Sequence, residues 1–374
     1  MKRLELLAVL LLCHGLSFAQ SSSCQPIRTT LAIPAKGLPG ILIKVFNAYP
    51  SRTLSNIFVE WELLLNGSVV QKGKLLQLTI GPQHSGSIRL PVRMPASPGE
   101  LFLNICYRLK KAAAPLPAGH PVAREQLRLR EYEYDLSIHP AGELSFTDEG
   151  GTFTITSAAN ALNLQFNKQT GWLQHYAIGP RLFAQDSSGL VTDLGQTPAF
   201  TQEPKLQLFS TSTSTDMAVV KADYLIPETP FLLHARYTIN AKGEMQVEQV
   251  LELDTMRPRD TSAMQTAVIY PPLFGMKWIL PAGFDSTLFY GEVPAIDSCH
   301  LSRVELHRPD AIDTAAWTDI RWWKLTDGQG HGMLISADSS LLSMHLHDKQ
   351  LYIGHPFTNG GANNYHYLYK VTPL

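Results

Sequence analysis

Alternation of apolar and polar residues with a period of two recurs throughout this chain and most constrains its fold. In residues 161–179, Leu162, Leu164 and Phe166 alternate with polar residues. A polar turn then ends at Gly171, where glycine tolerates positive φ, and a second alternating run follows. Successive side chains of a strand point to opposite faces, so the stretch predicts a β-hairpin. Helical periodicity does not recur after the N-terminus, and we expect an all-β protein.

Strand patterns in the first part of the chain are separated by turn residues at the spacing of about 8–12 residues that is typical of β-sandwiches. They cover residues 40–49, 57–74, 75–80, 85–92, 99–109 and 127–138. The dipeptide Asn66-Gly67 inside one of them is a strong hairpin signal. These features predict a sandwich of about 100 residues.

A stretch rich in Ala and Pro, residues 110–126, has the composition of a linker. Since few backbone hydrogen bonds are expected there, limited proteolysis should cut first within 110–122. Strand patterns resume beyond it and continue to the C-terminus, without the strand–helix alternation of a (β/α)₈ barrel. We expect two β-sandwiches, residues 20–138 and residues 139–374.

The N-terminus has the pattern of a secretory signal peptide. Lys2 and Arg3 precede an apolar run, and Ala19 before Gln20 fits a signal-peptidase site. The run is too short to span a bilayer, and a buried N-terminal helix is the alternative. We expect residues 1–19 to be removed and the mature protein to be exported, to the periplasm or outside the cell, without a membrane anchor.

Charge and cysteine content exclude several classes of partner and cofactor. The formal net charge is −1 with no long run of either sign, so nothing favours nucleic acid or an anionic membrane. Beyond the signal the cysteines are Cys24, Cys106 and Cys299, whose spacing is unlike a metal cluster and leaves any disulfide pairing open. Cys106 fits a buried small apolar side chain.

Catalytic constellations are not apparent in the sequence. The pair Glu60 and Glu62 and the pair Glu131 and Glu133 each share a strand face, which solvated faces explain. We therefore assign no catalytic residue. His345 and His347 also share a face, with His355 eight residues on, but scattered exposed histidines explain them and we expect no metal and no cofactor.

Three of the six tryptophans, Trp317, Trp322 and Trp323, fall within seven residues. The adjacent pair must point to opposite faces of a strand, so one can be core while the other is exposed or covered. A core tryptophan beside a packing one is the simpler interpretation; an exposed ring could stack on a sugar.

Several segments resemble, in order, the tail of long bacterial β-galactosidases of glycoside hydrolase family 2. The stretch "LQFNKQTGWLQHYAIG" is similar to the start of their C-terminal domain, and "WTDIRWWKLTDGQGHGMLI" and "YHYLYKVTPL" are similar to later parts of it. Upstream, "EWELLLNGSVVQKGKLLQLTIGPQHSGSIRLP" and "PAGHPVAREQLRL" resemble the immunoglobulin-like domain that precedes it.

This resemblance implies an immunoglobulin-like sandwich followed by a larger galactose-mutarotase-like super-sandwich. In the family both catalytic glutamates come from a barrel that lies before this tail, and the acid/base glutamate follows an asparagine. No Asn-Glu dipeptide is present here. Two segments also depart from the family pattern: "LFYGEVPAIDSCH" replaces a Gly-x-Gly-Pro-x-Glu-Asn-Tyr segment, and a Gly-Gly-Asp-Asp-Ser-Trp loop has no clear match.

The second departure allows two alignments. Either Gly360 and Gly361 correspond to the loop and Tyr365 replaces its tryptophan, or the loop is deleted and Tyr365 to Tyr367 begin the last strand, which we prefer. Aromatic, amide and charged groups suit sugars, so two segments supply the candidate carbohydrate-binding residues. They are Asp319, Arg321, Trp322, Trp323, His355, Asn359, Asn363, Asn364 and Tyr365.

Three functions follow from these observations. The first is a non-catalytic carbohydrate-binding or accessory module related to β-galactosidase, and predicted to be inactive alone. The second is the non-catalytic chain of a split β-galactosidase that needs a separate barrel chain as partner. The third is an independent enzyme on a mutarotase-like sandwich, with His and Glu as acid and base. Sequence alone does not identify the sugar, a galactoside under the first two hypotheses, or the oligomeric state.

Overall fold

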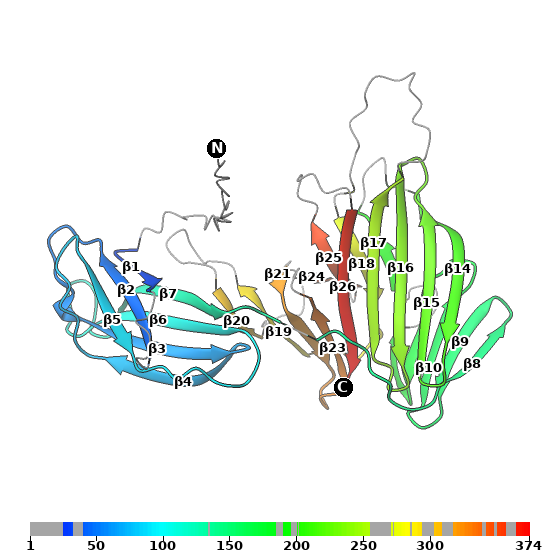
Figure 1. Ribbon diagram of the computed structural model, residues 1–374, viewed down its shortest axis with the longest axis horizontal. Helices are drawn as coiled ribbons and strands as arrows, with labels where there is room; N and C mark the ends of the chain where they lie inside the picture. The colour runs from blue at the N-terminus through cyan, green and yellow to red at the C-terminus, as the bar shows by residue number, and fades with distance from the viewer. Residues whose placement is uncertain are drawn as a thin grey trace, which may run out of the picture.

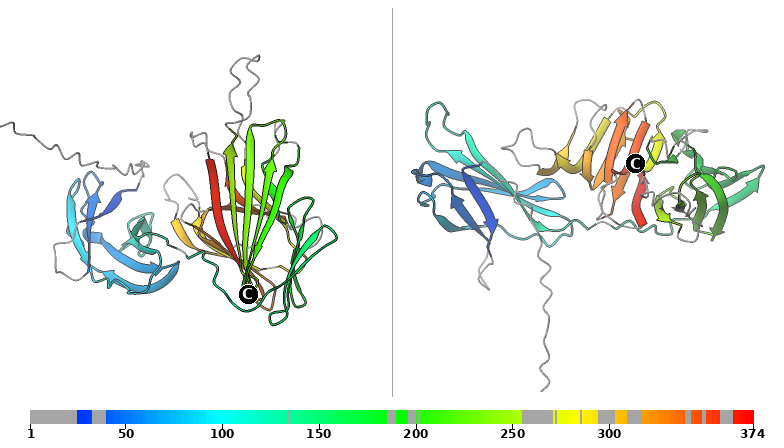
Figure 2. Two further views of the ribbon diagram at one scale, coloured as in Figure 1. Left: turned by 45° about the vertical axis from the view of Figure 1, so that its right-hand side comes forward. Right: turned by 90° about the horizontal axis from the view of Figure 1, so that it is seen from above.

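The computed structural model describes residues 25–32, 40–133, 135–184, 190–195, 200, 202–254, 271, 273–284, 286–293, 303–308, 317–338, 342–347, 350–356 and 364–374. Within these ranges the chain forms β-strands, one 3-10 turn, η1 (Leu54–Asn56), and no α-helix. The all-β expectation is confirmed. Figures 1 and 2 show a smaller sandwich from the first part of the chain beside a larger one. No helix among the described residues has the length and apolar character to cross a bilayer.

The first sandwich is immunoglobulin-like, with two antiparallel sheets. Its three-stranded sheet has the order β1 (Ile27–Leu31), β2 (Ile41–Asn47), β5 (Ser85–Leu90). Its four-stranded sheet has the order β4 (Ser68–Leu75), β3 (Ile57–Leu65), β6 (Leu101–Leu109), β7 (Pro121–Arg130). Asn66 and Gly67 both have positive φ, 48° and 82°, in the turn between β3 and β4, so the predicted hairpin is confirmed.

The second sandwich is the larger and is built from sheets of ten and nine strands. The ten-stranded sheet has the order β21 (Trp317–Ile320), β24 (Leu342–His347), β25 (Gln350–Pro356), β18 (Leu273–Ile279), β13 (Leu190–Asp193), β11 (Leu173–Ile178), β10 (Leu162–Asn167), β9 (Thr152–Ser157), β8 (Ser145–Glu149), with β12 (Arg181–Ala184) beside β11. The nine-stranded sheet has the order β14 (Lys205–Thr213), β15 (Met217–Leu225), β16 (Phe231–Asn240), β17 (Met245–Leu253), β26 (Asn364–Pro373), β23 (Gly332–Ala337), β22 (Trp322–Thr326), β19 (Ser286–Val293), β20 (Arg303–His307).

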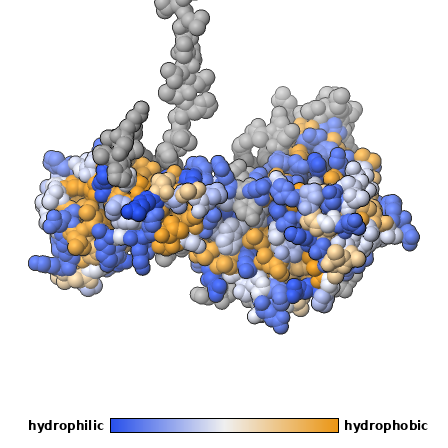
Figure 3. All heavy atoms as spheres, turned by 60° about the horizontal axis from the view of Figure 1, so that its bottom comes forward, coloured by the Kyte–Doolittle hydropathy of each residue, from blue (hydrophilic) through white to orange (hydrophobic). Residues whose placement is uncertain are grey.

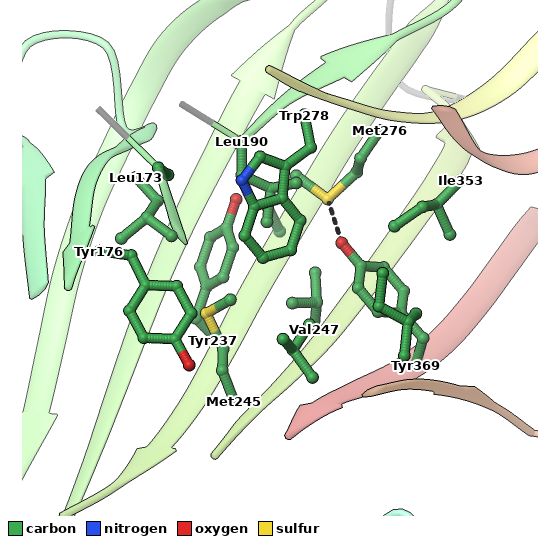
Figure 4. Close-up of a cluster of buried hydrophobic side chains, with 14 of the residues drawn as sticks. Leu173, Tyr176, Leu190, Tyr237, Met245, Val247, Met276, Trp278, Ile353 and Tyr369 are labelled. Carbon is green, nitrogen blue, oxygen red and sulfur yellow. Dashed lines mark hydrogen bonds between the residues drawn. The ribbon is translucent and has the colours of Figure 1, made fainter. Parts of the chain in front are cut away.

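Aromatic side chains fill the space between these two sheets (Figure 4). Trp278 is fully buried and donates its indole N–H to the Phe183 carbonyl at 2.9 Å. The Tyr369 hydroxyl lies 3.1 Å from the Met276 sulfur, and the Tyr176 hydroxyl bonds the Gly243 carbonyl. Because each ring brings a large apolar area and a polar tip that finds a partner, these residues stabilise the core of the super-sandwich.

The hairpin expected at residues 161–179 is present as β10 and β11. Gly171 has a φ of 78° in the turn. The register shifts between Gln165, which pairs with His175, and Phe166, which pairs with Leu173, so Gln174 is an extra residue on β11. This β-bulge breaks the strict alternation that the sequence suggested, and both Leu173 and Tyr176 face the core.

Three details of the expected first domain are wrong. Residues 110–120 of the linker-like stretch close the β6–β7 hairpin, with the Leu109 amide bonding the His120 carbonyl and Ala113 pairing with Leu116. The strand expected over 127–138 is β7, which begins at Pro121 and ends at Arg130. Residues 76–80 form no strand, although Leu78 and Ile80 enter the core. Composition does not report such cross-strand hydrogen bonds, which decide these boundaries.

The connection between the sandwiches, residues 131–144, runs over the outer face of the nine-stranded sheet (Figure 1). Carbonyls along it accept side-chain hydrogen bonds: Leu136 from Gln246 on β17 and His139 from Asn240 on β16. The Lys370 ammonium on β26 bonds the Ser137 carbonyl. The connection is therefore attached to three neighbouring strands, and the boundary expected after residue 138 lies within it.

The surface mixes polar and apolar residues over both sandwiches (Figure 3). Large exposed apolar side chains of the first sandwich are Leu31, Val69, Val70, Leu76 and Met94. Exposed apolar residues are common on protein surfaces and by themselves assign no function.

Candidate functional site

Arg321, one of the expected sugar-binding residues, lies at the boundary between the two sandwiches. Its side chain is 3% exposed, and its Nε and Nη2 donate to the two carboxylate oxygens of Glu100 at 3.0 and 2.8 Å. Its Nη1 donates to the Asp319 carbonyl at 2.7 Å. The guanidinium is thus committed to groups within the chain, and the structure does not offer it to a ligand from solvent.

Glu100 is fully buried at the same boundary and is well satisfied by hydrogen bonds. Besides Arg321, the Tyr290 hydroxyl on β19 donates to it at 2.7 Å. Burial raises the pKa of that hydroxyl strongly, and the nearby carboxylate raises it further. A buried ion pair persists only when its lone pairs and protons are matched in this way.

Trp322 and Trp323 point to opposite faces of β22, as expected for neighbours on a strand. Trp323 is 1% exposed in the super-sandwich core, packs against the Phe289 ring at 5.7 Å between centroids, and bonds Thr287 through its indole nitrogen. Trp322 is half-buried, 6.2 Å from the Tyr290 ring, and packs against the small apolar cluster that joins the two sandwiches. Trp323 is therefore a core residue, and Trp322 is partly covered by the contact between the sandwiches.

That small cluster makes the inter-domain contact apolar as well as ionic. It consists of Leu64 and Phe102 from the first sandwich and Tyr290 and Val304 from the second. Beside it, Gln126 on β7 accepts from the Val304 amide and donates to its carbonyl, each at 2.8 Å. The two sandwiches therefore contact one another directly through apolar packing, the Glu100 ion pair and paired hydrogen bonds.

Asp319 marks the point where the chain passes from one sheet of the super-sandwich to the other. Its φ is 53°, an uncommon value for a residue other than glycine, and its carbonyl is held by Arg321. It lies in β21, which belongs to the ten-stranded sheet, and β22, which begins three residues later, belongs to the nine-stranded sheet. Its side chain is half-buried, so it keeps partial access to solvent, as Trp322 does.

His355 lies two strands away from that crossing point in the ten-stranded sheet. Ile320 pairs with Leu342 on β24, and the next residue, Ser343, pairs with Gly354 on β25. With about 4.8 Å between neighbouring strands, the backbones of residues 320 and 355 are about 10 Å apart. The structure therefore brings the first candidate segment near the start of the second; the His355 side chain lies outside the described residues.

Asn364 and Tyr365 begin β26 and lie far from Trp322. Trp322 pairs with Ser336 on β23, and Ser336 pairs with Lys370 on β26. Lys370 lies six residues beyond Asn364 along β26. At about 3.3 Å per residue this is about 20 Å along the strand. Tyr365 to Tyr367 belong to the last strand, as the preferred alignment predicted. Asn359 and Asn363 lie outside the described residues, as do the side chains of Asn364 and Tyr365.

The histidines and cysteines give no metal site in the described part of the chain. The His345 ring packs on Tyr352, with centroids 5.9 Å apart, and the His347 side chain is not described. Among the described residues, no group of three or more His, Cys, Asp or Glu side chains is arranged so that it could hold a metal ion. Cys106 has a free thiol whose pKa is raised by burial; Cys24 and Cys299 lie outside the described residues.

A histidine between two carboxylates was missed by sequence reasoning. On the outer face of the nine-stranded sheet, His234 Nδ1 lies 2.7 Å from Asp223 on β15, and Nε2 lies 3.1 Å from Glu252 on β17. Burial lowers the pKa of His234, but the two carboxylates outweigh it and the net pKa is raised. Outward positions on three strands supply the group, and only the strand register reveals that they meet.

Comparison with known proteins agrees with the resemblance seen in the sequence. Residues 43–130 match the family model described as "Beta-galactosidase, domain 4". The chain is 24% identical over 350 residues to the β-galactosidase of Priestia megaterium (strain DSM 319 / IMG 1521), an alignment that covers 85% of this chain and 32% of that protein. It is 27% identical over 388 residues to that of Arthrobacter sp. (strain B7), covering 87% and 35%.

Two solved structures match part of this chain at low sequence identity. A GH36 α-galactosidase, AgaB from Geobacillus stearothermophilus, has a TM-score of 0.38 and 8% identity, over 62% of this chain and 41% of that one. Galactose 1-epimerase from Lactobacillus acidophilus NCFM has a TM-score of 0.35 and 10% identity, over 63% and 99%. Both likenesses are too weak to argue from.

The chain spans about a third of the length of the β-galactosidases that it matches. The family model covers its first sandwich, and the alignments extend over most of both sandwiches. Over most of its length, this chain is similar to the C-terminal region of β-galactosidases.

Proposed function

We propose that this chain is a non-catalytic accessory module related to β-galactosidase, which binds carbohydrate. The observation that carries the proposal is the fixed contact between its two sandwiches. Three features join them into one unit: the Glu100–Arg321 pair, the small apolar cluster beside Trp322, and the connection between the sandwiches with its hydrogen bonds to the nine-stranded sheet. A unit of this kind suits the presentation of a binding surface in a constant geometry.

The non-catalytic part of the proposal is supported by the resemblance itself. It assigns the family's catalytic glutamates to a barrel that precedes this region, and the Asn-Glu dipeptide does not occur in the sequence. Glycoside hydrolysis needs two carboxylates at a set separation across the scissile bond.

Hydrolysis of a chromogenic β-galactoside by purified residues 20–374 tests this part. We expect no turnover above a mock purification from cells that lack the gene. Activity that follows the protein through two independent purification steps and changes when a carboxylate of this chain is substituted would refute it. Asp223 and Glu252, which flank His234, are the first carboxylates to replace, because they would serve an independent acid–base enzyme.

Carbohydrate binding is tested separately, on the same protein. Galactose and β-linked galactobiose are titrated while tryptophan fluorescence and heat are recorded. We expect a dissociation constant of about 1 mM, because a shallow site buries little of a sugar. If neither signal changes at tens of millimolar, roughly ten times that constant, the carbohydrate part of the proposal fails and a partner-docking role remains.

The second candidate function is the non-catalytic chain of a split β-galactosidase. The specific observation that favours it is the similarity to the C-terminal region of β-galactosidases, in alignments that cover 68–87% of this chain. It predicts that a β-galactosidase chain truncated before this region gains activity when this protein is added. Co-purification without any gain in turnover would favour the accessory role.

Export belongs to the proposal as well. It rests on residues 1–19, whose charged start, apolar run and Ala19 fit a signal peptide. Mass spectrometry of the protein produced in a bacterial host should show a mature N-terminus at Gln20 and recovery from the periplasm or the medium. An intact Met1 in the cytoplasmic fraction would contradict it.

A further inference from the structure

A recess of about 570 Å³ lies beside the turn of the β10–β11 hairpin, remote from the segments around Arg321. We name it the hairpin recess and define it by Gln169, Thr170, Trp172, Gln174, Thr192 and Glu203. These residues come from the hairpin, from β13 and from the chain just before β14. The volume lies within the range of sites that hold small molecules.

Trp172 supplies an aromatic wall for this recess. Its indole stacks on the Tyr224 ring with centroids 4.3 Å apart and an interplanar angle of 12°. Tyr224 itself is buried, and the Trp172 side chain is half-buried. One face of the indole is thus supported by the core while part of it remains accessible in the recess, which is the arrangement that stacking on the C–H face of a sugar requires.

The turn backbone and the Thr192 hydroxyl of the recess are held in place by hydrogen bonds. The Asn167 side-chain oxygen accepts from the amides of Gln169 and Thr170, at 2.8 and 3.2 Å, and fixes the turn. The Thr192 hydroxyl accepts from the buried Gln249 amide at 2.7 Å, which leaves its proton to donate. Preorganised groups of this kind lose little entropy when they bind a ligand.

Gln174 is directed by the β-bulge described above. As the extra residue on β11 it has no partner on β10, and it lines the recess. Bulges occur often where a strand re-aims a side chain toward a site. Its amide offers both a donor and an acceptor, as sugar hydroxyls require.

The charges of the recess balance. Among its described lining residues the charged groups are Glu203 and Lys205, one acid and one base. A recess without net charge favours neither an anion nor a cation, whereas amides, hydroxyls and an indole suit a neutral polyhydroxylated ligand. The composition of the lining therefore selects among ligand classes.

We propose that the hairpin recess binds a neutral saccharide of one or two pyranose rings, with Trp172 as the stacking surface and Gln169, Gln174 and Thr192 bonding hydroxyls. This inference rests on the proposed carbohydrate-binding function and names its site. It assigns that site to the hairpin, in place of the segments around residues 319–323 and 355–365.

Calorimetric titration of residues 20–374 with galactose and β-linked galactobiose, compared across variants, tests the inference. Gln174→Ala should raise the dissociation constant at least fivefold, because it removes hydrogen bonds to the ligand. Gln165→Ala, on the neighbouring strand β10 and outside the recess, is the matched control and should bind like the wild type. Trp172→Phe keeps a ring against Tyr224 and should abolish the fluorescence change while heat is still released.

Each outcome has a separate meaning. If the wild type binds and Gln174→Ala binds equally well, the recess is not the site, and the proposed carbohydrate function stands. If the fluorescence change persists in Trp172→Phe, another tryptophan reports binding, and the inference is again overturned. If the wild type binds neither sugar, the carbohydrate function and this site fail together. Circular dichroism and urea midpoints confirm that each variant is folded.

Discussion

Arg321 and Glu100 form an ion pair across the boundary between the two sandwiches, with two nitrogens of the guanidinium bonded to the two carboxylate oxygens. The residues are 221 positions apart in the chain and are 3% and 0% exposed. Apolar packing by Leu64, Phe102 and Val304 surrounds the contact. A residue that the sequence suggested for sugar binding instead helps to fix one domain on the other.

Removal of one partner of this pair should be costly. We expect Arg321→Met to reduce the free energy of unfolding by about 3–5 kcal/mol, because it leaves the Glu100 carboxylate buried without its cation. Glu60→Gln is the control, since Glu60 pairs with Lys74 and Arg108 near the surface and should cost about 0–1 kcal/mol. Urea denaturation measures both, and equal losses would show that the buried pair has no special role.

Glu125 should make the protein less stable as the pH rises. It is half-buried beside the Thr29 amide, at 3.3 Å, and burial raises its pKa from 4.5 to about 7. Between these two values the folded state binds more protons than the unfolded state, so the free energy of unfolding falls as pH increases.

The variant Glu125→Gln removes this titration and keeps an acceptor for Thr29. It should match the wild type at pH 4 and be more stable by roughly 1–3 kcal/mol at pH 8. Urea unfolding across this pH range gives the difference, and a gap independent of pH would contradict the assignment.

His234 should contribute stability in its protonated form. Its pKa is raised above 6.5 because Asp223 and Glu252 outweigh the effect of burial. The contribution is complete below the unfolded value of 6.5 and is lost as pH rises through the higher folded value. His234→Asn should remove this pH dependence from the free energy of unfolding.

An NMR titration of the His234 ring provides the direct check. We expect a midpoint above the ordinary value that moves down in Asp223→Asn, because one of the two carboxylates is then neutral. A midpoint at or below the ordinary value would mean that burial dominates over the carboxylates.

Gly171 and Gly179 offer a matched pair of substitutions to alanine on one hairpin. Both have positive φ, 78° and 56°. A Cβ on Gly171 would lie 2.3 Å from the Tyr224 hydroxyl, whereas nothing lies within 4 Å of one on Gly179. Gly179→Ala should cost about 1–2 kcal/mol, and Gly171→Ala about 1–3 kcal/mol more because the ring must move. Equal urea midpoints would show that the turn adjusts without strain.

The sequence by itself determined the local elements of this protein. Period-two alternation identified the β10–β11 hairpin, and the strand patterns that continue beyond it predicted that the second sandwich is built from strands. Asn66-Gly67 and Gly171 located turns because few residues tolerate their positive φ. These successes share a cause: the choice between strand and turn depends on side chains a few residues apart.

Only the tertiary structure decided which of these residues meet. Nothing local in "TDIRWW" distinguishes an exposed Arg321 from one paired with Glu100, and the Ala- and Pro-rich stretch at 110–120 resembles a linker until Leu109 and His120 are seen to bond. The hairpin recess likewise needs the bulge at Gln174 and the approach of β13. Burial and hydrogen-bond pairing depend on strand register over long sequence separations, which a pattern of neighbouring residues does not encode.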